Sequence, residues 1–199
     1  MRRIFITVGI VTISITSVLA QGFGLGIKAG VNIANQDISA TGFSPETTSQ
    51  IGFHGGVFAV FMFTEKMGIQ PELLYSTGGS EVEITGEIYT EKLGYIILPV
   101  LFRYNISDVF SLHAGPQFGF LMSAEEEYAG DTYDIKDDFK GSDIAASFGL
   151  EVDLPIKLGI GARYALGLTD IVEEGGSWSG AEVKNGTFQI YAKFRFIGD

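Results

Sequence analysis

The stretch from Leu158 to Ile171 reads LGIGARYALGLTDI, and it decides the fold. Every second position from Leu158 to Leu168 is apolar, and the positions between are small or polar, with Arg163 near the middle. Because successive side chains of a strand point to opposite faces, this pattern predicts a strand with one apolar and one partly charged face. Globular strands usually have about 5–6 residues, whereas tilted membrane strands have roughly 9–11, so the length favours a membrane strand with its apolar face toward lipid.

The same alternation recurs along the chain and predicts eight strands. They span residues 24–36, 51–63, 67–77, 92–105, 109–122, 142–153, 158–171 and 186–196. Pro71 falls inside the third strand and cannot donate a ladder hydrogen bond, so we expect a β-bulge there. Residues 78–91 could form a loop, but their alternation of acidic and apolar side chains favours extensions of the two flanking strands.

The connections between these strands alternate between long and short. Long connections are expected at residues 37–50, 78–91, 123–141 and 170–184, and short turns at 64–66, 106–108 and 154–156. Loops at one rim and turns at the other are typical of an up-and-down barrel in a membrane. With an even strand count both chain ends lie at the short-turn rim, and pairing of the first strand with the eighth removes exposed sheet edges.

Composition agrees with such a barrel and excludes several other classes. The chain has 27 glycines, 16 phenylalanines and no cysteine, which removes disulfides and thiolate metal sites. A net charge of −11 disfavours nucleic acid, since phosphate contacts need a basic surface. Mean hydropathy is +0.25, yet beyond residue 20 no apolar run approaches the roughly 18 residues of a membrane helix.

The N-terminus has the pattern of a cleavable signal peptide. Two arginines precede an apolar stretch, and Val18-Leu19-Ala20 places small residues before a cleavage point at Gln21. The alternative is a membrane anchor, for which the apolar stretch is short. We therefore expect residues 1–20 to be a signal peptide and residues 21–199 to form one domain.

We predict an all-β fold, an eight-stranded antiparallel up-and-down transmembrane β-barrel. In this fold the apolar rows face lipid, and the small and polar rows face a closed interior. The alternative is a soluble, lipocalin-like barrel with the opposite facing and a small apolar ligand inside.

The segment YIILPVLFRYNISDVFSLHAGPQFGFL resembles the PorT-like outer-membrane β-barrel domain proteins. The matching residues are Tyr95, Pro99, Arg103, Tyr104, Gly115, Pro116 and Gly119, together with Arg163, Tyr164, Gly167 and Leu168 in ARYALGLTDI. Departures are Ile97, where the family often has glutamate, and three residues after Phe196, where outer-membrane strands typically end on the aromatic. The resemblance covers the chain from Gln21 onward. It implies a porin-like barrel of the bacterial outer membrane that contacts outer-membrane lipid and, during biogenesis, the barrel-assembly machinery.

A barrel of eight strands is just wide enough for side chains to fill it. Buried charges are costly unless paired, so we predict an ion-pair network in which Glu72 and Glu151 face arginines or lysines. The predicted members of this interior polar network are Glu72, Arg103, Glu151, Arg163, Lys193, Arg195, His54 and His113, with Lys28, Gln117 and Asp153 as further inward-facing candidates. The network is either a structural plug, which we favour, or the gate of a narrow pore.

Catalytic, cofactor and metal sites are not expected. Ser111 shares a face with His113, but such spacing is common by chance, and a hydrolase needs a nucleophile, a histidine and a carboxylate in reach. The acidic connection lacks the glycine at the sixth position of a calcium loop and is interpreted as a solvated loop. Its acidic residues are Glu125, Glu126, Glu127, Asp131, Asp134, Asp137 and Asp138.

The leading hypothesis is therefore a small outer-membrane barrel that acts as a structural or interaction protein. Its long acidic loops face the exterior and meet an extracellular partner. The alternative is a narrow pore for passive transport of small solutes.

Overall fold

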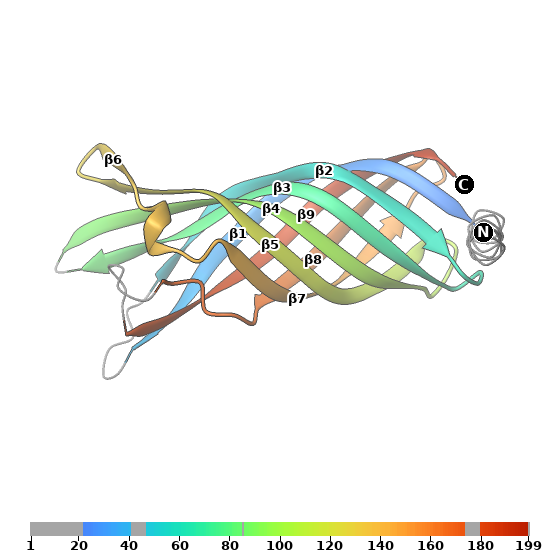
Figure 1. Cartoon of the computed structure of the whole chain (residues 1–199). Helices are drawn as coiled ribbons and strands as arrows, with labels where there is room; N and C mark the ends of the chain where they lie inside the picture. The colour runs from blue at the N-terminus through green and yellow to red at the C-terminus, as the bar shows by residue number, and fades with distance from the viewer. Residues whose placement is uncertain (1–21, 41–46, 85, 174–179, 199) are drawn as a thin grey trace, which may run out of the picture.

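The computed structural model describes residues 22–40, 47–84, 86–173 and 180–198. Within them, long antiparallel strands form one closed barrel (Figure 1). The strands of the barrel are β1 (Phe23–Ala40), β2 (Thr47–Met62), β3 (Met67–Ile84), β4 (Glu87–Asn105), β5 (Phe110–Tyr128), β7 (Ser142–Asp153), β8 (Leu158–Gly167) and β9 (Ala181–Ile197). The predicted signal peptide and Trp178 lie outside the described residues.

Strand pairing confirms the predicted up-and-down topology. Each strand of the barrel pairs with its neighbour in the chain, and β1 pairs with β9 from Leu25↔Ile197 to Ala40↔Ala181. Closure therefore satisfies the backbone groups of both terminal strands, which a membrane barrel requires. The start of β1 and the end of β9 lie at the rim with the short turns (Figure 1).

Several strands are longer than the alternation predicted. Residues 78–84 extend β3 and residues 87–91 extend β4, as expected, and the predicted loops at 37–50 and 170–184 also contribute residues to β1, β2 and β9. The seventh predicted strand is shorter, because β8 ends at Gly167 and the chain leaves the sheet before Ile171. Among the described residues, no helix is long and apolar enough to cross a membrane.

The acidic residues of segment 123–141 are exposed or partly exposed to solvent, as expected, but the segment is not an irregular loop. Its first residues continue β5 to Tyr128, which pairs back onto the short strand β6 (Asp131–Asp134). A 3₁₀ turn, η1 (Lys136–Asp138), follows. The backbone of the segment extends the sheet through β5 and β6, and Ala124 and Phe139 are buried in contact with neighbouring strands, whereas Tyr133 is exposed.

The prediction of a β-bulge at Pro71 is also wrong. The register between β3 and β4 runs unchanged through Pro71↔Val100, and the shift between β2 and β3 lies further along, between Ser49 and His54. A single missing donor is thus tolerated without an inserted residue.

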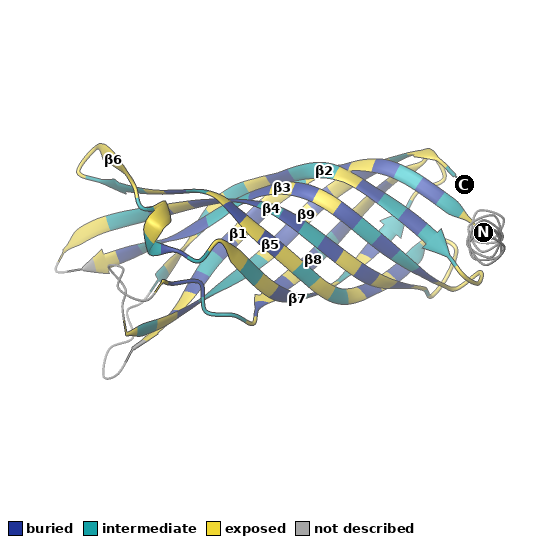
Figure 2. Cartoon of the chain, in the orientation of Figure 1, coloured by how far each residue is buried: buried dark blue, intermediate teal, exposed yellow. Residues whose placement is uncertain are grey.

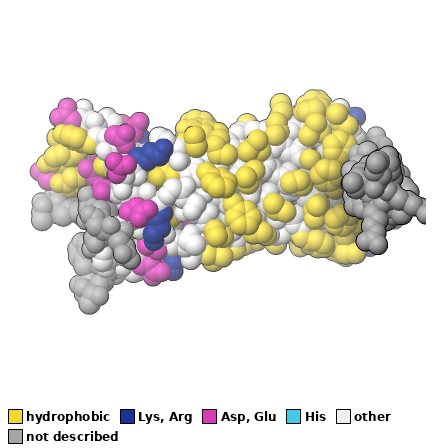
Figure 3. All heavy atoms as spheres, viewed as in Figure 1, with side chains coloured by type: hydrophobic (Ala, Val, Ile, Leu, Met, Phe, Trp, Pro, Cys, Tyr) yellow, Lys and Arg dark blue, Asp and Glu magenta, His cyan; other side chains and the backbone are white. Residues whose placement is uncertain are grey.

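The facing of the side chains is the one predicted for a membrane barrel. Ile160 is 56 %, Phe148 51 % and Ile190 50 % exposed, whereas Arg163 is 1 % exposed. Buried and exposed residues alternate along the strands (Figure 2), and apolar side chains form a broad band on the outside, which ends where charged side chains begin (Figure 3). Such an exposed apolar belt is stable only against lipid.

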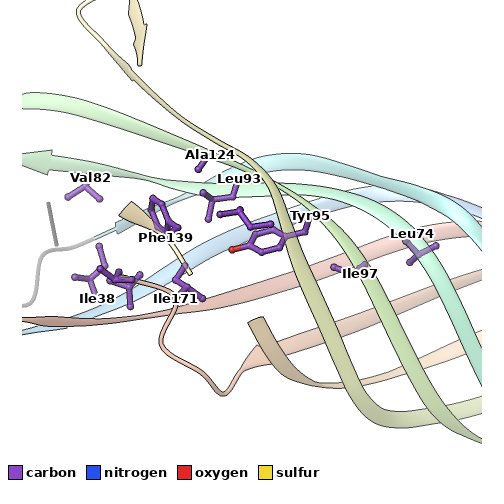
Figure 4. Packing of buried hydrophobic residues seen from close by; sticks show 12 residues of the cluster. Ile38, Leu74, Val82, Leu93, Tyr95, Ile97, Ala124, Phe139 and Ile171 are labelled. Carbon is purple, nitrogen blue, oxygen red and sulfur yellow. The ribbon is translucent and has the colours of Figure 1, made fainter. Parts of the chain in front are cut away.

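Beyond this band the strands enclose a second core, which we call the apolar cap. It consists of Ile38, Leu74, Val82, Leu93, Tyr95, Ile97, Leu121, Ala124, Phe139, Ile171, Val172 and Val183. Figure 4 shows Phe139 and Ile171, from two connections, between strands that carry Val82, Leu93 and Ile38. The long-loop end of the barrel is therefore closed by apolar packing, which the alternation of residues along the strands does not indicate.

Candidate functional site

Inward-facing glycines make room for the large side chains that fill the barrel. A Cβ added at Gly161 would lie 2.5 Å from the ring of Tyr191, and one at Gly149 would lie 2.3 Å from the backbone oxygen of Ala162. Real Cβ contacts are essentially never that short. The glycines on the inward rows are therefore a packing requirement of the interior.

Glu72 on β3 is the first of two buried anionic centres. Arg163 on β8 donates to both carboxylate oxygens, from Nη1 at 2.9 Å and from Nη2 at 2.7 Å. Lys28 on β1 donates from Nζ to Oε1 at 2.6 Å. The three side chains have no solvent exposure, and a bidentate guanidinium pair is the strong form of such a contact.

Glu151 on β7 is the second centre. It accepts hydrogen bonds from Arg103 Nη1 and from Lys193 Nζ. Two neutral groups complete its shell, the Tyr191 hydroxyl at 2.9 Å and Gln70 Nε2 at 3.1 Å. These donors satisfy the lone pairs of the carboxylate and offset the cost of burying its charge.

Lys28 joins the two centres. Its Nζ lies 3.4 Å from Oε1 of Glu151 and 3.9 Å from the centre of the Tyr191 ring. Gln70 also bridges them, because its Nε2 donates to Glu72 at 2.8 Å as well as to Glu151. The side chains of six strands thus form one connected network across the bore.

The predicted network residues meet as follows. Arg163 pairs with Glu72, and Arg103 and Lys193 pair with Glu151. Arg195 instead lies at the short-turn mouth, 3.6 Å from Asp153, which also accepts from Lys193 at 2.9 Å and from Arg103. The predicted ion pairs omitted Lys28, and the roles of Gln70 and Tyr191 were not foreseen. All three residues lie at inward-facing positions of their strands.

The two histidines flank the network without forming a catalytic arrangement. His54 Nδ1 lies 2.7 Å from Asn32 Oδ1, and His113 Nε2 accepts from Arg163 Nε at 3.3 Å. The hydroxyl of Ser111 has no hydrogen-bond partner in the described part of the chain, so it is not activated by His113. The geometry needed for a nucleophile and its base is absent from these residues.

The predicted acidic residues divide over β5, β6 and η1. Glu125, Glu126 and Glu127 lie on β5. In the register between β5 and β6, Glu125 lies opposite Asp134 and Glu126 opposite Tyr133. Burial, and then the Asp138 carboxylate, raise the pKa of Glu126. No group of three histidine or acidic side chains in the described ranges could hold a metal ion.

A polar clasp, formed by Lys140 and Asp170, ties down the connections that carry the apolar cap. Lys140 Nζ donates to Asp170 Oδ2 at 2.6 Å, and the backbone N–H of Val183 donates to Oδ1 at 2.9 Å. Burial raises the pKa of Asp170, but these bonds and one from the Val172 N–H outweigh it, so the pKa lies below its usual value.

Two cavities flank the network. A chamber of about 40 Å³ lies beneath the apolar cap, lined by Tyr95, Asp143 and Asn185 among others. A vestibule of about 910 Å³ opens at the short-turn mouth beside Arg103, Asp153 and Arg195. Between them the bore is occupied by the two anionic centres and their partners.

Comparisons with known proteins agree with this architecture. The family described as "Outer membrane protein beta-barrel domain" matches residues 19–173. No curated protein sequence matches the chain.

Solved barrels share the fold at low sequence identity. Ail, the attachment invasion locus protein of Yersinia pestis, is 17% identical with a TM-score of 0.52, over 88% of this chain and 99% of that one. Its complex with the heparin analogue sucrose octasulfate gives 18% identity, a TM-score of 0.50 and the same coverage. Neisserial surface protein A is 12% identical with a TM-score of 0.51, over 85% and 97% of the two chains.

The family match spans well over half of the chain and agrees with the closed barrel, its apolar belt and its charged interior. The chain belongs to the outer membrane protein beta-barrel domain family and is a β-barrel of the bacterial outer membrane.

Proposed function

We propose that the protein is a non-conducting interaction protein of the outer membrane, in which the interior network is a structural plug. The observation that carries this proposal is the filled bore. Glu72, Glu151 and Lys28 have no exposed side-chain surface, and the apolar cap closes the bore a second time on the outer side. An ion would have to break both layers to pass.

Planar-bilayer recording of the refolded protein tests the plug. We expect no stepwise conductance from the wild type. The double variant Glu72→Ala, Arg163→Ala removes an anionic centre together with its guanidinium, so combining it with Phe139→Ala should admit water and produce conductance steps. Conductance by the wild type would establish the alternative, a narrow pore.

The partner would be engaged by the sheet that projects beyond the apolar band. Residues 80–93 and 123–139 hold eleven acidic residues and two lysines, Lys92 and Lys136. This charge favours a cationic partner and repels polyanions. Ail was crystallised with a heparin analogue; for this chain we expect no binding to heparin.

Binding of immobilised poly-lysine and heparin to proteoliposomes tests the surface. We expect poly-lysine to be retained and released by salt, because exposed charges are screened beyond about 10 Å at 0.1 M salt. Neutralising Glu125, Glu127, Asp131 and Asp134 to amides should weaken retention and lower the salt concentration that releases poly-lysine. The matched control neutralises Glu65 and Asp108 at the opposite rim and should retain poly-lysine; binding to heparin instead would contradict the proposal.

The N-terminal segment completes the proposal. Residues 1–20 would be removed as a signal peptide during export, after which the barrel-assembly machinery inserts residues 21–199 in the membrane. The Val18-Leu19-Ala20 triplet supports this cleavage point. N-terminal sequencing of the protein from outer membranes should begin at Gln21, and a sequence that begins at Met1 would refute it.

A further inference from the structure

Asp143, at the start of β7, is a carboxylate on the inner wall of the barrel that has no cationic partner among the described residues. Its oxygens accept from Thr169 Oγ1 at 2.9 Å and from Asn185 Nδ2 at 3.0 Å. Both donors are neutral. The negative charge of Asp143 is thus hydrogen-bonded but not neutralised within the described structure.

The positive charges of the interior lie too far away to neutralise it. Arg103, Arg163, Lys28 and Lys193 surround the anionic centres, and Glu151 is eight residues from Asp143 along the same strand. Arg163 lies opposite Gly149, six residues from Asp143, and at about 3.3 Å per residue this separation is roughly 20 Å, well beyond the range of an ion pair. The interior therefore has a surplus of cations near its centre and an uncompensated carboxylate beneath the apolar cap.

The chamber at Asp143 has the chemistry of a cation site. Its wall includes Ser76, Gln117 and Thr187, and the oxygen-bearing groups of such residues suit hard cations. Tyr95 lines the chamber and also belongs to the apolar cap, in which Figure 4 labels it. Its hydroxyl lies 3.5 Å from Asn185 Nδ2.

Volume and charge restrict the ligand. A space of about 40 Å³ holds a bare ion with one or two waters, because a single water needs about 10–15 Å³ on this measure. It is too small for a drug-sized ligand, which needs roughly 300 Å³ or more. Because Asp143 is the carboxylate on the chamber wall, a single charge on the ligand suffices to neutralise it.

We propose that this chamber is a binding site for a small monovalent cation, Na⁺, K⁺ or NH₄⁺. The cationic groups around Glu72 and Glu151 repel the ion from the rest of the bore. Binding at Asp143 is therefore compatible with a barrel that does not conduct, and it does not depend on the extracellular partner.

Thermal unfolding in zwitterionic micelles tests the site. The chlorides of Na⁺, K⁺ and NH₄⁺ each replace N-methyl-D-glucamine chloride at constant ionic strength, so that only the identity of the cation changes. We expect the unfolding midpoint of the wild type to rise saturably with at least one small cation. Comparison of the three salts distinguishes a metal ion from ammonium.

Variants test whether the cation-dependent rise in the unfolding midpoint comes from Asp143. Asp143→Asn should lower the apparent cation affinity at least tenfold, whereas Asp131→Asn, which neutralises an exposed carboxylate on β6, should leave it unchanged. Asn185→Asp adds a second carboxylate to the chamber and should increase the rise in midpoint, which provides a test should Asp143→Asn fail to fold. An unfolding midpoint independent of cation identity, or an equal response from the wild type and Asp143→Asn, would overturn the proposal.

Discussion

Replacement of Glu151 by glutamine should be among the most destabilising single changes in the barrel. The carboxylate lies at the meeting point of Arg103, Lys193 and Lys28 and has no exposed surface. Glutamine keeps the shape and an acceptor for the Tyr191 hydroxyl but leaves the three cations without their shared counter-charge. Removing one partner of a buried ion pair costs about 3–5 kcal/mol, so we expect Glu151→Gln to lower the free energy of unfolding by about that amount.

A double-mutant cycle with Lys193→Gln separates charge from packing. Removing a cation as well reduces the unbalanced positive charge, so the double variant should be more stable than the sum of the single effects by about 0.5–3 kcal/mol. Urea unfolding in lipid vesicles, followed by the β-sheet circular dichroism signal, measures all three variants. The control, Glu125→Gln on the exposed part of β5, should stay within about 0.5 kcal/mol of the wild type. A Glu151→Gln barrel as stable as this control would refute the reasoning that buried pairing holds the interior together.

Three further predictions follow from the packing and the clasp. Gly161→Ala should destabilise the barrel by about 1–3 kcal/mol through overpacking against the facing aromatic ring, while Gly141→Ala, with open space around it, should be neutral in the same urea assay; equal effects would contradict the packing. Phe139→Ala should speed hydrogen exchange of the amides around the apolar cap without changing exchange in the membrane band, and an unchanged cap would show that Phe139 does not hold it. The pKa of Asp170 is lower in the folded state than its ordinary value of about 3.9. The stabilisation of the folded state by ionised Asp170 is therefore fully present above that ordinary value and is lost as pH falls through the lower folded-state pKa. The Val183 amide should therefore be protected at pH 5–7, lose protection at more acidic pH, and exchange quickly even at neutral pH in Asp170→Asn; protection in that variant would contradict the clasp.

The barrel itself was predictable because its signal is local. In a membrane strand the alternation of Ile160 with Gly161 and Arg163 follows directly from the period of two, and the eight repeats with long and short connections specify an up-and-down ring. The same alternation placed Glu72 and Glu151 inside. The fold and the inward facing of these residues therefore follow from short stretches of sequence.

The apolar cap was not predictable because its signal is scattered. Phe139 and Ile171 stand among polar and acidic residues, and each becomes buried only by meeting strand ends that are remote in sequence. The pairing within the network has a similar origin. Lys28 lies 44 residues from Glu72 and 123 from Glu151, so its choice of partners depends on strand tilt and register around the closed barrel, which alternation does not specify.

The central claim is that apolar rows face acyl chains while charged rows face the interior. Because the chain has no native cysteine, single cysteines at positions 148, 160 and 190, each carrying a spin label, report the environment of the outer rows in lipid vesicles. The label at each of these positions should collide readily with oxygen dissolved in the acyl chains and rarely with a water-soluble nickel chelate. Labels that meet neither reagent, as in a dry protein core, or that meet the chelate freely would contradict the membrane facing on which the fold and the proposed plug depend.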